Sequence, residues 1–181
     1  MPALLRSRRS HGLMRLATSA AGTISMIRLG GIVAALVLVA DQVSKAFFLD
    51  FVAQHNPPVV AVTPFFNLVQ VWNTGVSFGL FQEDSDLRSW TLIGVAVAVL
   101  VWLSIWLWRA QTRLVALGLG GIIGGAIGNI VDRVRFGAVF DFLDFHAFGW
   151  HWPAFNLADS TIVVGVGLLL IDGFRPNSSG T

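Results

Sequence analysis

Four strongly apolar segments follow one another along the chain, at residues 29–48, 90–108, 114–131 and 156–171. An α-helix needs about 20 apolar residues to cross a bilayer. Counting back by this length from the end of the last segment places its outer boundary near Trp152. The pattern therefore predicts an all-α membrane protein with four transmembrane helices.

The composition agrees with a membrane location. Hydrophobic residues make up 55% of the 181 residues and charged residues only 12%, whereas a soluble domain usually carries about 25% charged residues. The chain has no cysteine, which excludes disulfides, a thiol nucleophile and a thiolate metal site. We expect one transmembrane domain at residues 29–172. A basic, partly disordered tail at 1–28 precedes it, and a short tail at 173–181 follows it.

The arginines predict which side of the membrane each connecting segment occupies. Positive residues accumulate in cytoplasmic segments, and they dominate residues 1–28, the turn at 109–113 and the C-terminal tail. Both termini are therefore expected in the cytoplasm, and residues 50–88 outside it. In that outer segment, β-branched and aromatic residues at 59–63 and 65–72 predict a small extracytoplasmic sheet. The acidic residues that come later are expected in a solvated loop: Glu83, Asp84 and Asp86.

The third apolar segment carries glycines at helical spacing. Gly120, Gly124 and Gly128 are four residues apart, and Gly121 and Gly125 lie beside them. Small residues at this spacing let helix backbones approach closely in lipid. We therefore expect the third helix to pack tightly against its neighbours.

Ionisable side chains interrupt the apolar segments at a common depth. Asp41 and Asp159 are each predicted to lie about 10 Å below the outer surface, at a rise of about 1.5 Å per residue. Charged groups at such depth are costly and indicate a functional site. Lys45 lies one helical turn from Asp41 and is expected to pair with it. The third segment presents three residues on one face: Gly125, Asn129 and Arg133.

Two carboxylates are the best candidates for catalysis. Paired aspartates share a proton, so that one acts as a base on water while the other donates a proton to a carbonyl. We predict that Asp141 and Asp159 form this pair, with the turn at Asn73 folding over them from outside. Spacing alone does not choose between Asp141 and Asp144, which lies three residues later. The positive end of the last helix favours a negative charge at Asp159.

Other kinds of site fit the residues less well. Ser44 and Lys45 are adjacent in sequence, so they would point in different directions on a helix. A metal site made from Asp141, Asp144, His146 and His151 is conceivable but matches no defined ligand spacing. The remaining acids of this region are expected to be structural or solvated, with Asp132 paired to Arg133 or Arg135 and Asp144 in solvent.

Five motifs resemble those of the lipoprotein signal peptidases, or signal peptidase II, in order along residues 30–171. They are DQVSK from Asp41, VWNTGVSFG from Val71, GGAIGNIVDR from Gly124, GAVFDF from Gly137 and PAFNLADS from Pro153. By motif position, Asp141 and Asp159 correspond to the catalytic pair. The resemblance implies that ten further residues line or support the site: Asp41, Lys45, Asn73, Gly75, Gly125, Asn129, Arg133, Phe155, Asn156 and Ala158.

The resemblance implies a membrane aspartic endopeptidase that removes the signal peptide from diacylglyceryl-modified prolipoproteins, cutting before the lipid-bearing cysteine. It implies lateral entry of substrate from the bilayer, no metal or other cofactor, no nucleic-acid partner, and inhibition by the cyclic peptide globomycin. The expected location is the bacterial inner membrane, with a monomeric enzyme whose active site lies near the extracytoplasmic face. The family fold adds a short outer helix between the third and fourth spans. Aromatic residues at 142–150 suit the membrane interface, and we expect this helix to be mobile and to gate the site.

A small transporter or channel subunit is the main alternative, because buried Asp, Asn and Lys side chains can form an ion path. Against it, the polar residues gather at one depth, and the second apolar segment has only Thr91 and Ser104 as polar groups. A non-catalytic membrane scaffold is a third class, but it would leave the aspartates at membrane depth unexplained.

Overall fold

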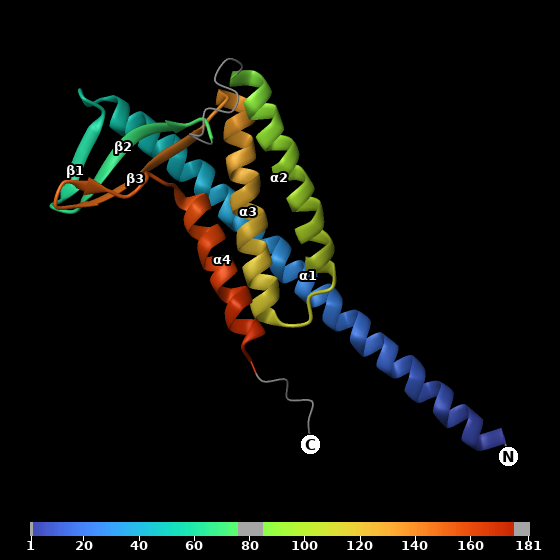
Figure 1. Ribbon diagram of the computed structural model, residues 1–181. Helices are drawn as coiled ribbons and strands as arrows, with labels where there is room; N and C mark the ends of the chain where they lie inside the picture. Colours follow the sequence, from blue (N-terminus) through green and yellow to red (C-terminus); the bar gives the residue numbers. More distant parts are fainter. Residues whose placement is uncertain (1, 76–84, 176–181) are drawn as a thin grey trace.

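A computed structural model describes residues 2–75 and 85–175, and for 2–21 and 85–88 it describes the backbone only. Within these residues the chain forms four helices and a four-stranded sheet at one end of the bundle (Figure 1). Glu83 and Asp84 of the expected acidic loop lie outside the described residues, and Asp86 falls in a helix. The helices are α1 (Pro2–Ala53), α2 (Ser85–Trp108), α3 (Arg113–Phe136) and α4 (Leu157–Gly173).

Three of the described helices are long and apolar enough to cross a membrane, through Gly22–Ala53 of α1, Ser89–Trp108 of α2 and the whole of α3. The helix α4 has 17 residues, which is shorter than the about 20 that a perpendicular span requires. The structure thus contains the four expected helices, of which three are candidate spans. The helix α1 begins at Pro2 and is helical through the basic segment, and the division into tail and membrane domain stays a prediction.

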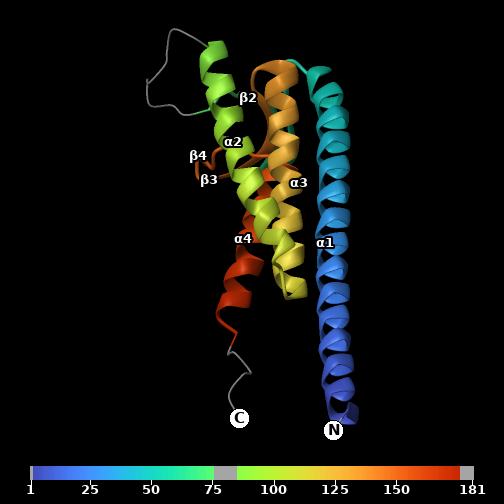
Figure 2. The ribbon, with the colours of Figure 1, turned by 90° about the vertical axis from the view of Figure 1, so that its right-hand side faces the viewer.

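The helix α3 lies between α1 and α4, as two perpendicular views show (Figures 1 and 2). A Cβ added at Gly120 would lie 2.5 Å from the carbonyl oxygen of Gly30 on α1. On the other side of α3, a Cβ at Gly125 would lie 2.6 Å from the carbonyl oxygen of Ala158 on α4. Only glycine permits such contacts, so the expected close packing of the third helix is confirmed.

The sheet is antiparallel and has the order β1-β2-β3-β4. Its strands β1 and β2 confirm the sheet expected after the first helix. Asn73 of β2 pairs with Val139 of β3, and Val71 pairs with Asp141. This register brings the Asn73 turn next to Asp141 across 68 residues of chain. The strands are β1 (Val59–Thr63), β2 (Phe66–Asn73), β3 (Val139–Ala147) and β4 (Trp150–His151).

An apolar cluster fastens the sheet to the end of α1. Val52 of α1 packs with Leu68, Phe140 and Phe142 of the sheet, and all four side chains are buried. The ring of Phe142 stacks on that of Phe48, with centroids 4.7 Å apart. These contacts fix β3 against α1 and so hold the two aspartates of this strand, Asp141 and Asp144, in place.

The outer helix predicted at residues 142–150 is wrong, because this stretch forms the β3–β4 hairpin. Phe142, Phe145 and Phe148 recur every third residue, which resembles a helical repeat. Instead, β2 satisfies the backbone of β3, and the hairpin turns at Phe148 and Gly149, both with positive φ. The side chain of Phe142 is buried rather than at the membrane interface. The mobile helix that was expected to gate the site is therefore not present in residues 142–150.

Candidate active site

Asp141 is held on β3 by two side-chain amides. Its Oδ2 accepts a hydrogen bond of 3.0 Å from Nδ2 of Asn73, and its Oδ1 accepts one of 2.6 Å from Nδ2 of Asn156. The residue is only 1% exposed. Burial raises the pKa of Asp141 to about 6; the hydrogen bond from Asn73 opposes this rise, and the negative charge of Asp159 adds to it. Asp141 therefore keeps a proton at higher pH than an ordinary aspartate does.

The turn after β2 orients the amide of Asn73. The backbone N–H of Gly75 donates to Oδ1 of Asn73 over 2.9 Å, which leaves the Nδ2 group facing Asp141. Gly75 has φ of +90°, a left-handed conformation that glycine adopts without strain. The glycine thus contributes its backbone freedom to the position of Asn73.

Asp159 lies in the first turn of α4 and belongs to the cap of that helix. Oδ1 of Asn156 accepts from the backbone N–H of Asp159 at 3.0 Å, and Oδ2 of Asp159 accepts from the backbone N–H of Asn156 at 3.2 Å. This reciprocal capping box fixes the carboxylate at the helix start. The other oxygen of the Asp159 carboxylate, Oδ1, accepts a hydrogen bond of 2.8 Å from Nδ2 of Asn129 on α3.

Asn156 and Asn129 connect the two aspartates. Asn156 is fully buried, and besides Asp141 and the backbone of Asp159 its amide reaches Oδ1 of Asn129 at 3.3 Å. The two carboxylates therefore belong to one continuous network of side-chain amides drawn from β2, α3 and the start of α4. Spacing and topology predicted Asn129 and the Asn73 turn near the site, whereas Asn156 was expected only from the family resemblance.

Lys45 forms a second cluster beside this network. Its Nζ lies 2.9 Å from Asp41 and 2.8 Å from Asp132, and it donates to Oδ1 of Asn129 over 3.0 Å. The expected Asp41–Lys45 pair is confirmed. Asp41 also accepts from the backbone N–H of Ala158 at 3.0 Å, which ties α1 to the first turn of α4.

The partner predicted for Asp132 is wrong. Asp132 pairs with Lys45, and it accepts hydrogen bonds from Nε2 of Gln42 and from the backbone N–H of Phe140. Successive residues of a helix point about 100° apart, so neighbouring Arg133 faces another direction. The contribution of Gln42 was missed, although it lies in the DQVSK motif, because a neutral amide at helical spacing gives no separate signal.

Arg133 has an unused donor next to the two candidate acids. Its Nη1 donates to the carbonyl oxygen of Asn129 at 3.3 Å. Its buried Nε has no hydrogen-bond partner within residues 2–75 and 85–175. The guanidinium group is within electrostatic reach of both Asp159 and Asp141, so its positive charge acts on the candidate site.

The other predicted residues act through packing. The backbone of Phe155 bonds to β3 at Leu143, and its ring stacks on Phe145 with centroids 6.0 Å apart. Ala158 is fully buried, and its carbonyl oxygen lies where any side chain on Gly125 would have to go. These residues fix the start of α4 against β3 and α3.

Asp144 is not the solvated residue that was expected. It is 6% exposed, accepts from Nδ2 of Asn67 at 2.9 Å, and lies 2.8 Å from Nδ1 of His151. Burial raises its pKa, but the hydrogen bonds from His151 and Asn67 outweigh burial and hold the pKa below the usual range. Side chains three positions apart on a strand lie on opposite faces, so Asp144 points away from the face of Asp141.

The metal alternative gains no geometric support. In the part of the chain that the structure describes, no three His, Cys, Asp or Glu side chains converge as metal ligands would. Asp144, His146 and His151 do gather on one hairpin, where the two histidine rings stack with centroids 4.9 Å apart. Asp141 faces the amide network instead.

An apolar groove of about 550 Å³ adjoins Asp159. Its walls come from the segment that precedes α4 and from one side of α4 itself. The acid is thus reached from an apolar surface of the bundle. The lining residues are Trp152, Pro153, Ala154, Phe155, Asp159, Ser160, Val163 and Val164.

A bundle of apolar helices that holds two aspartates in one amide network has the arrangement expected of a membrane-bound aspartic peptidase. Residues 33–175 match the profile of the Signal peptidase (SPase) II family, Peptidase A8. The chain belongs to this family, and the resemblance found in the five motifs is confirmed. It is therefore an aspartic endopeptidase of the signal peptidase II type.

Individual proteins agree with this assignment. The chain is 50% identical over 144 residues to the lipoprotein signal peptidase of Methylobacterium sp. (strain 4-46), covering 80% of this chain and 87% of that protein. It is 45% identical to the lipoprotein signal peptidase of Beijerinckia indica, covering 84% and 91%. A solved structure described as a bacterial membrane enzyme superposes with a TM-score of 0.68 at 26% identity, over 82% of this chain and 94% of the other.

Proposed function

We propose that this enzyme removes the signal peptide from diacylglyceryl-modified prolipoproteins, and that Asp141 and Asp159 activate the attacking water. The observation that carries the proposal is the amide network: Asn156 donates to Asp141 and caps Asp159, while Asn129 donates to Asp159. Neutral amides, rather than ion pairs, position the two carboxylates, although the charge of Arg133 is within electrostatic reach of both. Positioning by amides is the condition under which two aspartates share one proton.

The two acids then have different roles. Asp141, with its raised pKa of about 6, carries the shared proton and donates it to the oxygen of the scissile carbonyl. Asp159, at the positive end of α4, acts as the base that takes a proton from water. As the tetrahedral diol collapses and its C–N bond breaks, Asp159 gives its proton to the leaving amine. Asp141 takes back a proton from a diol hydroxyl, and the pair returns to its starting state. The positive charge of Arg133, within electrostatic reach of both acids, is suited to stabilise the negative charge that develops on the carbonyl oxygen of the substrate.

The substrate approaches through the lipid. The groove beside Asp159 is lined chiefly by apolar residues of α4 and of the segment before it, which suits an acylated peptide that diffuses within the bilayer. Cleavage falls before the lipid-modified cysteine when the acyl chains stay in this apolar groove and the peptide bond lies against the aspartates. Globomycin-type cyclic peptides would occupy the same place.

We propose the following placement in the bacterial inner membrane. Both termini are cytoplasmic, α4 completes a fourth span, and the sheet and the aspartates lie near the extracytoplasmic face. The clustered arginines of the N-terminal segment and of the 109–113 turn support this orientation. One copy of the chain contains every residue assigned to the site, so the working unit is a monomer.

The proposal is tested by reconstituting the purified protein in vesicles with a lipid-modified prolipoprotein and following the size of the product. Asp141→Asn and Asp159→Asn are each expected to lower the rate by roughly a thousandfold or more, because neither amide can exchange the shared proton. Asp144→Asn is the matched control on the same strand and should retain activity. Addition of a chelator should change nothing. Normal cleavage by Asp159→Asn would refute the pair, and loss of activity with chelator would favour the metal alternative.

A further inference from the structure

The side-chain amides of the candidate site present N–H groups, and not oxygens, to both aspartates. The two ends of an asparagine amide have nearly the same shape, so the surrounding hydrogen bonds decide which end is the oxygen. Oδ1 of Asn73 accepts from the backbone N–H of Gly75. Oδ1 of Asn156 accepts from the backbone N–H of Asp159. Because a backbone N–H can only donate, both amides turn their Nδ2 groups to Asp141.

The third amide, that of Asn129, takes its orientation from a lysine. Its Oδ1 accepts a hydrogen bond of 3.0 Å from Nζ of Lys45, across 84 residues of chain. Nδ2 of Asn156 also approaches this oxygen, at the longer distance of 3.3 Å. An ammonium group has three N–H donors and no acceptor, so the end of the amide that faces it must be the oxygen. The Nδ2 group of Asn129 is therefore directed at Oδ1 of Asp159, 2.8 Å away.

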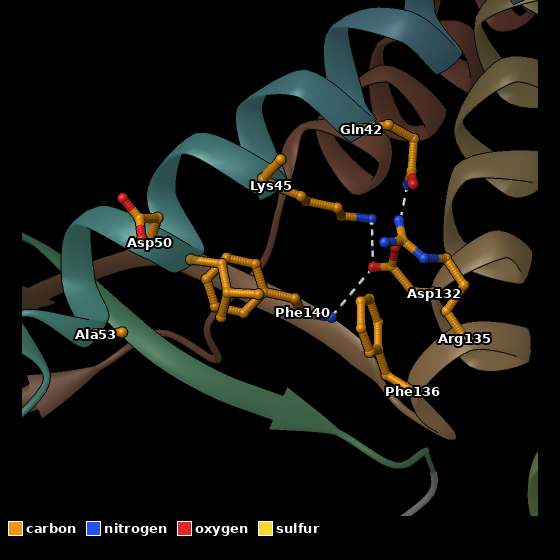
Figure 3. A pocket seen from close by; sticks show the side chains of 10 residues that line it. Gln42, Lys45, Asp50, Ala53, Asp132, Arg135, Phe136 and Phe140 are labelled. Carbon is orange, nitrogen blue, oxygen red and sulfur yellow. Dashed lines mark hydrogen bonds and ion pairs between the residues drawn. The ribbon is translucent and has the colours of Figure 1, made fainter.

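The ammonium group of Lys45 is itself held in place by two carboxylates. Its Nζ lies 2.9 Å from Asp41 and 2.8 Å from Asp132, and the residue is only 5% exposed. Figure 3 shows its side chain reaching from α1 toward Asp132 on α3, along the wall of a cavity of about 380 Å³. The two carboxylates occupy two of the three N–H groups, and the third is left for Asn129. The direction of this third donor is thus set by anions on two helices.

The orientation of Asn129 matters because Asp159 is the proposed base. An N–H group that faces a carboxylate stabilises its charged form, and only that form can take a proton from water. A reversed amide would turn its oxygen to Asp159, where a hydrogen bond requires a protonated carboxyl group. The proton would then lie on the acid that has to be free of it, and a smaller fraction of the enzyme would be ready for the attack by water.

We propose that Lys45 is a positioning residue for this reaction, and that its hydrogen bond to Asn129 keeps Asp159 in the charged form that activates water. The inference rests on the proposed roles of the two aspartates and extends them to the group that orients one of them. Lys45 acts through Asn129 and takes no part in the proton transfers. Its positive charge also lowers the pKa of Asp141, so a test must separate the effect of the charge from that of the hydrogen bond.

Two double variants make this separation. Lys45→Met with Asp41→Asn and Lys45→Gln with Asp41→Asn each remove one cation and one anion, so the net charge of the cluster is unchanged. Glutamine keeps an N–H group for Asn129, whereas methionine has none. In the vesicle assay, with rates expressed per folded enzyme, we expect kcat of the methionine variant to be about tenfold below that of the glutamine variant, the effect of one hydrogen bond to a charged group. KM should be equal, because Lys45 lies outside the groove beside Asp159.

Equal kcat in the two double variants, whether both are fast or both are slow, would overturn the proposal. A difference confined to KM would also overturn it, because Lys45 would then act on substrate binding. The parent enzyme and Asp159→Asn test the proposed function itself. If the parent cleaves and Asp159→Asn does not, equal rates in the double variants refute only the role of Lys45.

A single variant at Asn129 tests the orientation without removing the lysine. Asn129→Asp keeps the shape of the side chain and an oxygen for Lys45, but it turns a second oxygen to Asp159. Its kcat is expected to fall at least as far as that of the methionine variant. Asn67→Asp makes the same change beside Asp144 and should retain the kcat of the parent. Parent-like turnover in Asn129→Asp would refute the proposal.

Discussion

Two pairs of aspartates lie side by side in this protein, and they differ in what holds them. Asp41 and Asp132 share a cation, because Lys45 contacts both at 2.9 and 2.8 Å. Asp141 and Asp159 are held by amides, with Asn129 as the contact between the two groups. A cation between two acids keeps them ionised and binds helices together, whereas amides leave a proton free to move. The lysine cluster is therefore structural, and the amide-held pair is suited to chemistry.

The largest effect is expected when the cation is removed. Lys45→Met would leave Asp41 and Asp132 buried without a counter-charge, and breaking such a pair costs about 3–5 kcal/mol. Thermal unfolding in detergent should show a large loss of stability. The double variant Lys45→Met with Asp41→Asn should be less destabilised, because one buried charge is gone. An unchanged melting temperature in the single variant would remove the distinction between the two pairs.

A smaller loss is expected from crowding the same cluster. A Cβ on Gly128 would run into the carboxylate of Asp41, and overpacking of this kind costs about 1–3 kcal/mol. Gly128→Ala should therefore melt earlier than the parent. Gly31→Ala is the matched control on α1, where an added Cβ meets nothing within 4 Å, and it should melt at the parent temperature or slightly above. Equal behaviour of the two variants would contradict the packing that places Asp41.

A third acid, Asp144, tests whether burial alone makes an aspartate catalytic. Asp144→Asn loses the charge that pairs with His151, and we expect a loss of about 1 kcal/mol in the free energy of unfolding. Turnover should stay near that of the parent, because this side chain lies on the other face of β3. Denaturant unfolding and the cleavage assay measure the two effects separately. A collapse of turnover with intact stability would mean that Asp144 belongs to the site.

The finest test is the pH dependence. Because burial raises the pKa of Asp141 to about 6, kcat/KM should fall as the pH rises through this value and the proton is lost. Asn73 donates to the charged form, so Asn73→Ala should raise the pKa further and shift this limb to higher pH. Asn67→Ala, which removes the corresponding donor to Asp144, should leave the limb in place. The same shift in both variants would mean that the limb does not report Asp141.

The sequence predicted the parts of this arrangement that depend on local spacing. Helical periodicity placed Lys45 on the same face as Asp41, and glycine spacing placed α3 between two close neighbours. The first two strands followed from their β-branched residues and the turn after them. These features need only a short window of chain, which is the range over which periodicity is informative.

What could not be predicted depends on partners that are distant in sequence. The sequence of β3 has the spacing of an amphipathic helix. It forms a strand because it pairs with β2, which lies more than 60 residues earlier in the chain. Asp132 pairs with Lys45 on another helix and not with the arginines next to it in sequence. Its side chain points toward α1, and theirs point in other directions around α3. Asp144 is buried by Asn67 and His151, and no spacing rule connects these residues.

The capping box at Asn156 determines where this chain can tolerate changes in length. One side chain both begins α4 and holds Asp141, so the separation of Asn156 from Asp159 cannot change without breaking the cap. At the hairpin tip, in contrast, Phe148 is exposed and an added Cβ on Gly149 would meet nothing within 4 Å. Neither residue contacts the two acids. Residues added at the tip would lengthen the β3–β4 hairpin and leave the aspartates where they are. Insertions at this tip are therefore expected to preserve the site, whereas an insertion between Asn156 and Asp159 would break it.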